Sequence, residues 1–105
     1  MANIMKMMKQ MADMQKNLGK VQEALAAQEM EYTAGGGVIT VKITGDGNIT
    51  GIRIAPQAVT PDDVDMLEDL VLTAVRGAQD LAKETSAREM KKLTAGMNLP
   101  PGLGF

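Results

Sequence analysis

Residues 4–25, with the sequence IMKMMKQMADMQKNLGKVQEAL, decide the fold that we expect for this chain. Large apolar side chains recur here at alternating intervals of three and four residues, which is a heptad repeat. The pattern predicts a helix from residue 2 to about residue 28 with one narrow apolar seam, and such a seam packs against another helix. The residues of this seam are Ile4, Met7, Met11, Met14, Leu18, Val21 and Leu25.

The charges of this predicted helix lie away from the seam. The positions that flank it carry no charge: Met8, Gln10, Gln15, Asn17, Gln22 and Ala24. The four lysines fall on the opposite side and are called the lysine stripe below: Lys6, Lys9, Lys16 and Lys20. Such a stripe is either a solvated helix face or a contact for an anionic partner.

Residues 29–55 change from the helical period to a period of two. Apolar side chains alternate with polar ones over residues 30–34, 39–43 and 52–54, which predicts three short strands. Glycines at 35–37 and the sequence Gly45-Asp46-Gly47-Asn48 are turn signals. No Gly-Lys-Ser or Gly-Lys-Thr follows the first glycine run, so we interpret it as a turn or bulge rather than a phosphate-binding loop.

A second long helix is predicted over residues 61–95. Thr60 is the expected N-cap, with Pro61 in the first helical position and Asp63 in the third. Gly96 is the expected residue just past the end, and Pro100 cannot continue a helix. The apolar face of this helix comprises Val64, Leu67, Leu70, Val71, Ala74, Val75, Ala78, Leu81 and Ala82. We expect one domain over residues 1–96 and a flexible tail over residues 97–105.

Composition excludes several classes of function. The chain has neither Cys nor His, which removes disulfides, thiolate metal sites and most nucleophile–base pairs. One Tyr and one Phe are too few for a platform that stacks single-stranded bases. The acids at residues 62–69 fit a helix start better than a calcium loop. We therefore expect no enzyme, no cofactor and no metal, and a soluble intracellular protein without membrane-spanning or signal segments.

The order of elements predicts an α+β fold with a long helix, a three-stranded antiparallel sheet and a second long helix. A sheet covered by one helix is a small core, so both helices are expected to project beyond it. Projecting apolar helices need partners, which favours a homodimer. The net charge is −2, but residues 1–20 hold four Lys and one Asp whereas residues 57–81 hold six acids and one Arg. Local charge rather than net charge steers an anionic partner.

The chain resembles the YbaB/EbfC family of nucleoid-associated proteins along its whole length. The segments that carry the resemblance are Met7-Met8-Lys9-Gln10-Met11, Gly35-Gly36-Gly37-Val38-Ile39-Thr40-Val41 with Gly45-Asp46-Gly47, Ile52-Arg53-Ile54, Met66-Leu67-Glu68-Asp69-Leu70 and Leu99-Pro100-Pro101-Gly102-Leu103. The resemblance implies a tweezers-shaped homodimer that binds double-stranded DNA with low sequence preference at the nucleoid of a bacterial cytoplasm. It implies that basic residues of the first and last helices contact DNA, here Lys6, Lys9, Lys16, Lys20, Lys83, Arg88, Lys91 and Lys92.

A second hypothesis remains open from the residues themselves. Methionine side chains are flexible and polarizable, so a Met-rich seam adapts to partners of different shape. The alternative function is therefore a helical adaptor or chaperone-like protein that binds another protein through its Met-rich helices.

Overall fold

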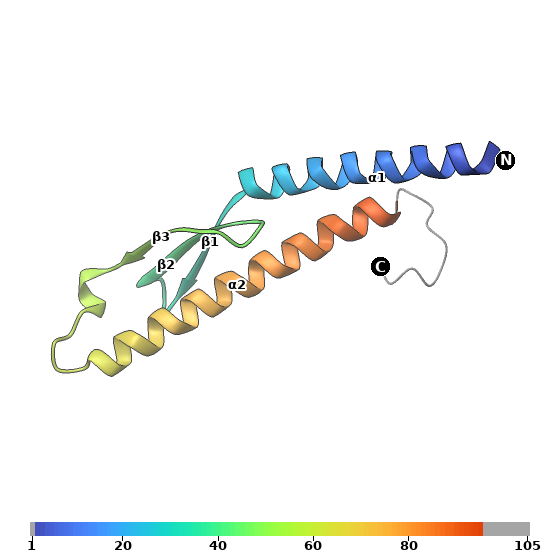
Figure 1. The fold of residues 1–105 in the computed structure, drawn as a ribbon. Helices are drawn as coiled ribbons and strands as arrows, with labels where there is room; N and C mark the ends of the chain where they lie inside the picture. Colours follow the sequence, from blue (N-terminus) through green and yellow to red (C-terminus); the bar gives the residue numbers. More distant parts are fainter. Residues whose placement is uncertain (1, 96–105) are drawn as a thin grey trace.

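The structure, a computed structural model, describes residues 2–95 and contains two long helices and one antiparallel sheet, which lies along the second helix (Figure 1). The elements in chain order are α1 (Ala2–Ala27), β1 (Glu29–Ala34), β2 (Ile39–Thr44), β3 (Ile49–Ile54), the short 3-10 helix η1 (Pro56–Ala58) and α2 (Val64–Ala95). The expected α+β fold is confirmed. Gly96 and the expected tail over 97–105 lie outside the described residues.

The three strands form a meander in the order β1-β2-β3. Tyr32 pairs with Val41 across β1 and β2, and Val41 pairs with Ile52 across β2 and β3. The register shifts between Lys42 and Ile43, so that β3 has one extra residue there. This bulge lets Ile49 and Ile52 face the same side of the sheet although they are three residues apart.

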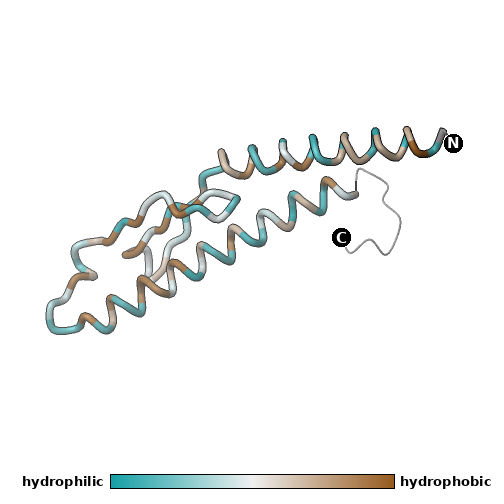
Figure 2. The backbone as a smooth tube through the Cα atoms, in the orientation of Figure 1, coloured by the Kyte–Doolittle hydropathy of each residue, from teal (hydrophilic) through white to brown (hydrophobic). Residues whose placement is uncertain are grey.

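The core lies where β2 meets α2. Ile39, Val41 and Ile43 are fully buried on one face of β2. The facing stripe of α2 consists of small residues spaced by one helical turn, Ala74, Ala78 and Ala82, all of them buried. Small side chains allow the helix to approach the sheet closely. Figure 2 shows the apolar positions, in brown, recurring along the strands and along both helices.

The sheet and α2 approach each other closely at Gly77. A Cβ atom added at Gly77 would collide with the ring of Tyr32 on β1. Gly19 of α1 has nothing within 4 Å of the corresponding position. The two helical glycines therefore have different roles, although the sequence presents both as weak points of a helix.

We expect Gly77→Ala and Gly19→Ala to change stability in opposite directions. Alanine is the better helix former, so Gly19→Ala should stabilise the protein by up to about 1 kcal/mol. Overpacking against the Tyr32 ring should make Gly77→Ala destabilising by about 1–3 kcal/mol. Urea unfolding followed by circular dichroism measures both. A Gly77→Ala variant as stable as Gly19→Ala would contradict the close packing of β1 on α2.

The start of α2 differs from the expectation. The helix begins at Val64, and Oδ1 of Asp63 accepts a hydrogen bond from the Met66 backbone N–H at 3.2 Å. Asp63 is therefore the N-cap, and the assignment of Thr60 was wrong. The Thr60 carbonyl instead accepts from the Asp63 N–H at 2.9 Å within the preceding turn. Both residue types are good caps, and the path of the chain out of η1 decides between them.

α1 runs beside the C-terminal half of α2 and extends past the end of α2 (Figure 1). Its C-terminal end is fixed to the β2–β3 turn, because the Gly45 N–H donates to the Leu25 carbonyl at 2.9 Å and Leu25 is only 4% exposed. The resulting molecule is elongated, with a longest dimension of 73 Å. The sequence predicted a partner helix for the seam, and part of that partner is α2 of the same chain.

The burial of the seam decreases along α1 toward its N-terminus. Leu25 is buried, and Met14, Leu18 and Val21 are half-buried. The next three seam residues are mostly exposed, at 64% for Met11, 59% for Met7 and 63% for Ile4. Within the described chain, α2 therefore covers only the C-terminal part of the seam.

Candidate nucleic-acid interface

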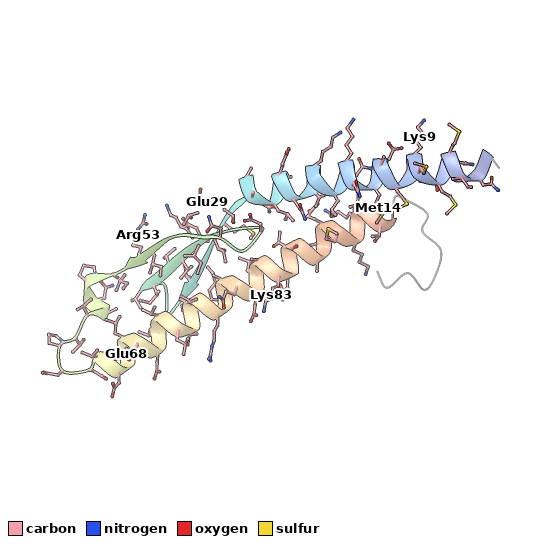
Figure 3. All side chains as sticks on the ribbon, in the orientation of Figure 1. Lys9, Met14, Glu29, Arg53, Glu68 and Lys83 are labelled. Carbon is pink, nitrogen blue, oxygen red and sulfur yellow. The ribbon has the colours of Figure 1, made fainter. Side chains whose placement is uncertain are left out.

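The lysine stripe forms one continuous exposed face on α1. All four of its lysines are exposed, and at 100° per residue their directions fall within about 80° of one another, opposite the seam. Figure 3 shows Lys9 pointing away from α2. Within residues 2–95, none of the four forms an ion pair. Asp13 is the one acidic residue among the stripe positions between Lys6 and Lys20, so the face keeps a positive local charge.

The basic residues of α2 are spread more widely than those of the stripe. At 100° per residue, Arg88, Lys91 and Lys92 share a face about 100° wide, whereas Lys83 lies about 80° further around the helix. Lys92 forms an ion pair with Glu89 at 3.4 Å. Arg88 donates to the Thr85 hydroxyl at 3.5 Å. These neighbours reduce the positive charge that the end of α2 presents to solvent.

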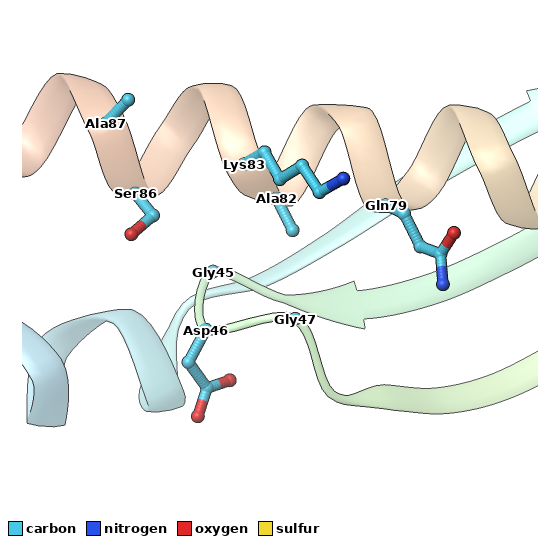
Figure 4. Close-up of a pocket in the computed structure, with 8 residues that line it drawn as sticks. All are labelled: Gly45, Asp46, Gly47, Gln79, Ala82, Lys83, Ser86 and Ala87. Carbon is cyan, nitrogen blue, oxygen red and sulfur yellow. The ribbon is translucent and has the colours of Figure 1, made fainter.

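Lys83 lies beside an open hollow between α2 and the β2–β3 turn. The hollow has a volume of about 530 Å³ and is lined by Gly45, Asp46, Gly47, Gln79, Ala82, Lys83, Ser86 and Ala87. The Lys83 side chain extends along α2 toward Gln79 (Figure 4). The side chain of Asp46 contacts the Thr44 hydroxyl within its own turn. Lys83 thus lies beside the β2–β3 turn and apart from the stripe of α1.

The sequence analysis omitted two basic residues of the sheet. Lys42 and Arg53 lie on the sheet face that points away from α2, since their strand neighbours Val41 and Ile52 point toward it. Figure 3 shows Arg53 and Lys9 on the same side of the molecule. Glu31 of β1 pairs with Lys42 of β2. Glu29, two residues before Glu31, lies on the same face of the sheet. The period-two pattern of the strands could have placed both basic residues on this face. The two glutamates balance the positive charge of Lys42 and Arg53 there.

The two ends of the molecule differ in charge. The stripe lies toward the N-terminal end of α1, whereas α2 begins at the opposite end of the molecule (Figure 1). That opposite end carries an acidic cluster of Asp62, Asp63, Asp65, Glu68 and Asp69. Among the described residues, no group of three or more acidic side chains is arranged to hold a metal ion. A polyanion is therefore attracted to the stripe and repelled from the start of α2.

An exposed basic stripe on a helical arm is the kind of surface that nucleic-acid-binding proteins present to a polyanion. The YbaB/EbfC DNA-binding family model matches residues 1–97, and the chain belongs to this family. The family is one of DNA-binding proteins and not of enzymes. In the described part of the chain, neither helix has the length and hydropathy that a membrane span requires.

Relatives along nearly the whole chain bear the name nucleoid-associated protein. One from Akkermansia muciniphila is 48% identical over 98% of this chain and 99% of its own length. One from Desulforamulus reducens is 50% identical over 93% of each chain, and one from Rhizobium meliloti is 39% identical over 98% of this chain and 96% of its own. These names support the DNA-binding hypothesis over the adaptor hypothesis.

The fold is also found in a solved structure. An uncharacterized protein from Helicobacter pylori has a TM-score of 0.67 to this chain, with 18% sequence identity, over 83% of this chain and 87% of the other. At this identity the likeness concerns the fold alone.

Proposed function

We propose that this protein binds double-stranded DNA as a homodimer, through contacts to phosphates and with low sequence preference, at the nucleoid in the bacterial cytoplasm. The observation that carries the proposal is the lysine stripe on the free side of α1. Family membership supports DNA as the partner. The eight basic residues of α1 and α2 are the proposed contacts, and the stripe provides the larger share.

The dimensions of the stripe suit a DNA backbone. Lys6 and Lys20 are 14 residues apart, which corresponds to about 21 Å along a helix. Each DNA strand advances about 3.4 Å along the duplex axis per phosphate, so about six phosphates of one strand fall within that length of the axis. Lysine ammonium groups neutralise phosphates without reading base edges, so contacts of this kind give affinity and little sequence preference.

We expect the DNA affinity to depend steeply on salt. The logarithm of the binding constant falls by about 0.9 per phosphate contact for each unit of log salt concentration. Four to six effective lysines per dimer should give a slope of roughly −4 to −5. Gel-shift titrations from low to physiological salt, on two duplexes of unrelated sequence, measure the slope and the preference. An affinity that is flat across this range would contradict the phosphate mechanism.

An apolar surface at the other end of the molecule supports the dimer. β3 is an edge strand, and α2 contacts mainly β1 and β2. Ile52 of β3 is consequently 49% exposed although its cross-strand partner Val41 is fully buried. Ile49 and Ile54 lie on the same face of β3 as Ile52, and Leu72 lines a groove together with Ile54. These four exposed side chains are called the β3 surface below. A groove beside it is lined by Ile54, Leu67, Glu68, Val71, Leu72 and Val75.

A second copy of the chain is the partner that we propose for the β3 surface. Contiguous apolar patches of more than a few hundred Å² mark interaction sites. β1, the other edge strand, carries Glu29 and Glu31, and charged residues protect edges from pairing. β3 has only Arg53 as a charged residue. An antiparallel β3–β3 contact about a two-fold axis would join two sheets and cover the same patch on both copies. The two α1 arms would then project as the tips of the tweezers.

A further inference from the structure

Asp13 lies at the centre of the lysine stripe. At 100° per residue, its direction falls inside the arc of about 80° that the four lysines occupy. Lys6 precedes it by seven residues and Lys20 follows it by seven, so each of these lysines is about 10 Å away along the helix axis. Lys9 and Lys16 are its nearer neighbours, four residues before it and three residues after it. The carboxylate therefore lies in the middle of the face that we propose to contact DNA.

The fold gives no reason for an acidic residue at this position. Asp13 is exposed and points away from the seam, and within residues 2–95 it forms no ion pair. It lies about three turns into α1, beyond the first turn in which an acid interacts favourably with the helix dipole. Aspartate is also one of the weaker helix formers. Asp13 thus lowers both the stability of α1 and the attraction of the stripe for phosphates.

We propose that Asp13 reads a base and gives this protein a modest preference for cytosine in the DNA that α1 contacts. The inference rests on the proposed function and adds to it a residue that determines sequence preference. In the major groove, cytosine presents its N4 amino group as a donor, and aspartate accepts from it. Guanine and thymine present acceptor oxygens there, and adenine places the acceptor N7 beside its amino group. A carboxylate is repelled by these acceptors, so cytosine is the base that suits it best.

The dimensions of α1 suit this contact. A helix with its side chains is about 10–12 Å in diameter, and the major groove is about 12 Å wide. The face that carries the stripe is directed away from α2, as Lys9 shows in Figure 3. A straight helix follows the curved groove closely only at its middle, and its ends lie nearer the sugar–phosphate rims. The short Asp13 side chain then faces the base edges, while Lys6 and Lys20 reach phosphates on the rims.

The expected preference is small beside the affinity that the phosphates supply. One carboxylate that accepts from one amino group should favour cytosine by about 5- to 10-fold. Proteins that bind defined DNA sites discriminate by about 1,000-fold or more. The preference that we infer is therefore compatible with a protein that covers DNA of many sequences.

The variant Asp13→Ala tests the inference. A pool of duplexes with a randomised centre is bound at low salt, and the bound duplexes are sequenced. The most enriched duplex is then titrated beside the same duplex with its enriched C·G pair changed to T·A. For the parent we expect enrichment of cytosine and a 5- to 10-fold weaker affinity, approximately, for the changed duplex. For Asp13→Ala the ratio should fall below about 2-fold, while both duplexes bind more tightly because a negative charge has left the stripe.

Two further variants complete the experiment. Asp13→Asn keeps the shape of the side chain, and because asparagine pairs with N6 and N7 of adenine, its pool should be enriched in adenine instead of cytosine. Glu23→Ala is the matched control, since it removes an exposed acid of α1 that lies outside the interval from Lys6 to Lys20. Its preference for cytosine should equal that of the parent. Circular dichroism should show that all three variants remain folded, because each changed side chain is exposed.

The outcomes separate the inference from the proposed function. If Asp13→Ala strengthens binding to both duplexes by the same factor, or if the parent pool shows no enrichment of cytosine, Asp13 does not read a base although the protein binds DNA. An Asp13→Asn pool that still favours cytosine would also overturn the inference. If the parent binds no duplex even at low salt, the proposed function itself is wrong, and the inference falls with it.

Discussion

The variant Lys6→Glu/Lys9→Glu/Lys16→Glu is expected to lose DNA binding almost completely. Three of the four stripe lysines in each protomer become acidic, so the arm repels phosphates where it attracted them. Because most of the effective phosphate contacts are lost and the new carboxylates repel phosphates, we expect a decrease of at least about 100-fold at physiological salt. The three side chains are exposed and the seam is untouched, so each change should cost no more than about 0.5 kcal/mol of stability.

Two double variants with equal charge changes separate the contributions of the helices. Lys6→Ala/Lys9→Ala removes charges from the coherent stripe of α1. Lys91→Ala/Lys92→Ala removes the same number from the end of α2, where Lys92 is already paired with Glu89. Gel shifts should show the larger loss, and the larger decrease in salt slope, for the α1 pair. If the triple charge reversal bound DNA normally while remaining folded, the stripe would be excluded as the DNA surface and the adaptor hypothesis would gain support.

The variant Ile52→Glu/Leu72→Glu is expected to convert the dimer into a folded monomer. Both side chains are nearly half exposed in the single chain, so glutamates there leave the core intact. In the proposed dimer the same glutamates would be buried without partners, at a cost of several kcal/mol. Light scattering at micromolar concentration should give twice the 11.2 kDa chain mass for the parent and the single chain mass for the variant.

The matched control places two glutamates on the other exposed apolar surface. Met5→Glu/Met8→Glu introduces the same charge on α1, where Met5 is 78% and Met8 64% exposed. This control should remain a dimer. Dissociation of the control but not of the β3 variant would place the dimer contact on the α1 arms. A monomeric parent protein would refute the dimer itself.

The sequence predicted the elements well because their patterns are local. The heptad repeat gave α1 to within a residue of its end at Ala27, and the glycine turns separated three strands in the expected order. The start of α2 was missed by three residues because Thr60 and Asp63 both suit a cap, and the 3-10 helix Pro56–Ala58 had no signal that we recognised. The bulge in β3 was also missed. The period-two pattern places Ile49 and Ile52 on opposite faces, and only the pairing with β2 shows that they share one face.

The sequence likewise predicted one part of the candidate site and not the rest. The position of the lysine stripe opposite the seam follows from helical periodicity, so the sequence alone predicted a basic face on α1. The sequence could not show that Lys83 lies beside the β2–β3 turn, because that contact joins residues far apart in the chain. Nor could it show which apolar residues stay uncovered. Ile52 and Val41 look alike as strand residues, and Met7 and Met14 look alike as seam residues.

What the sequence by itself determined are the properties that repeat along the chain: the period of each element, the side on which its charges fall, and the absence of Cys and His. The tertiary structure alone decided which faces are covered. Within the described residues, α2 packs across β1 and β2 and lies beside the C-terminal part of the seam, which leaves β3 exposed, and also Ile4, Met7 and Met11 of α1. Whether a face is covered depends on the position of another element that packs against it. That position is set by contacts between residues far apart in the chain.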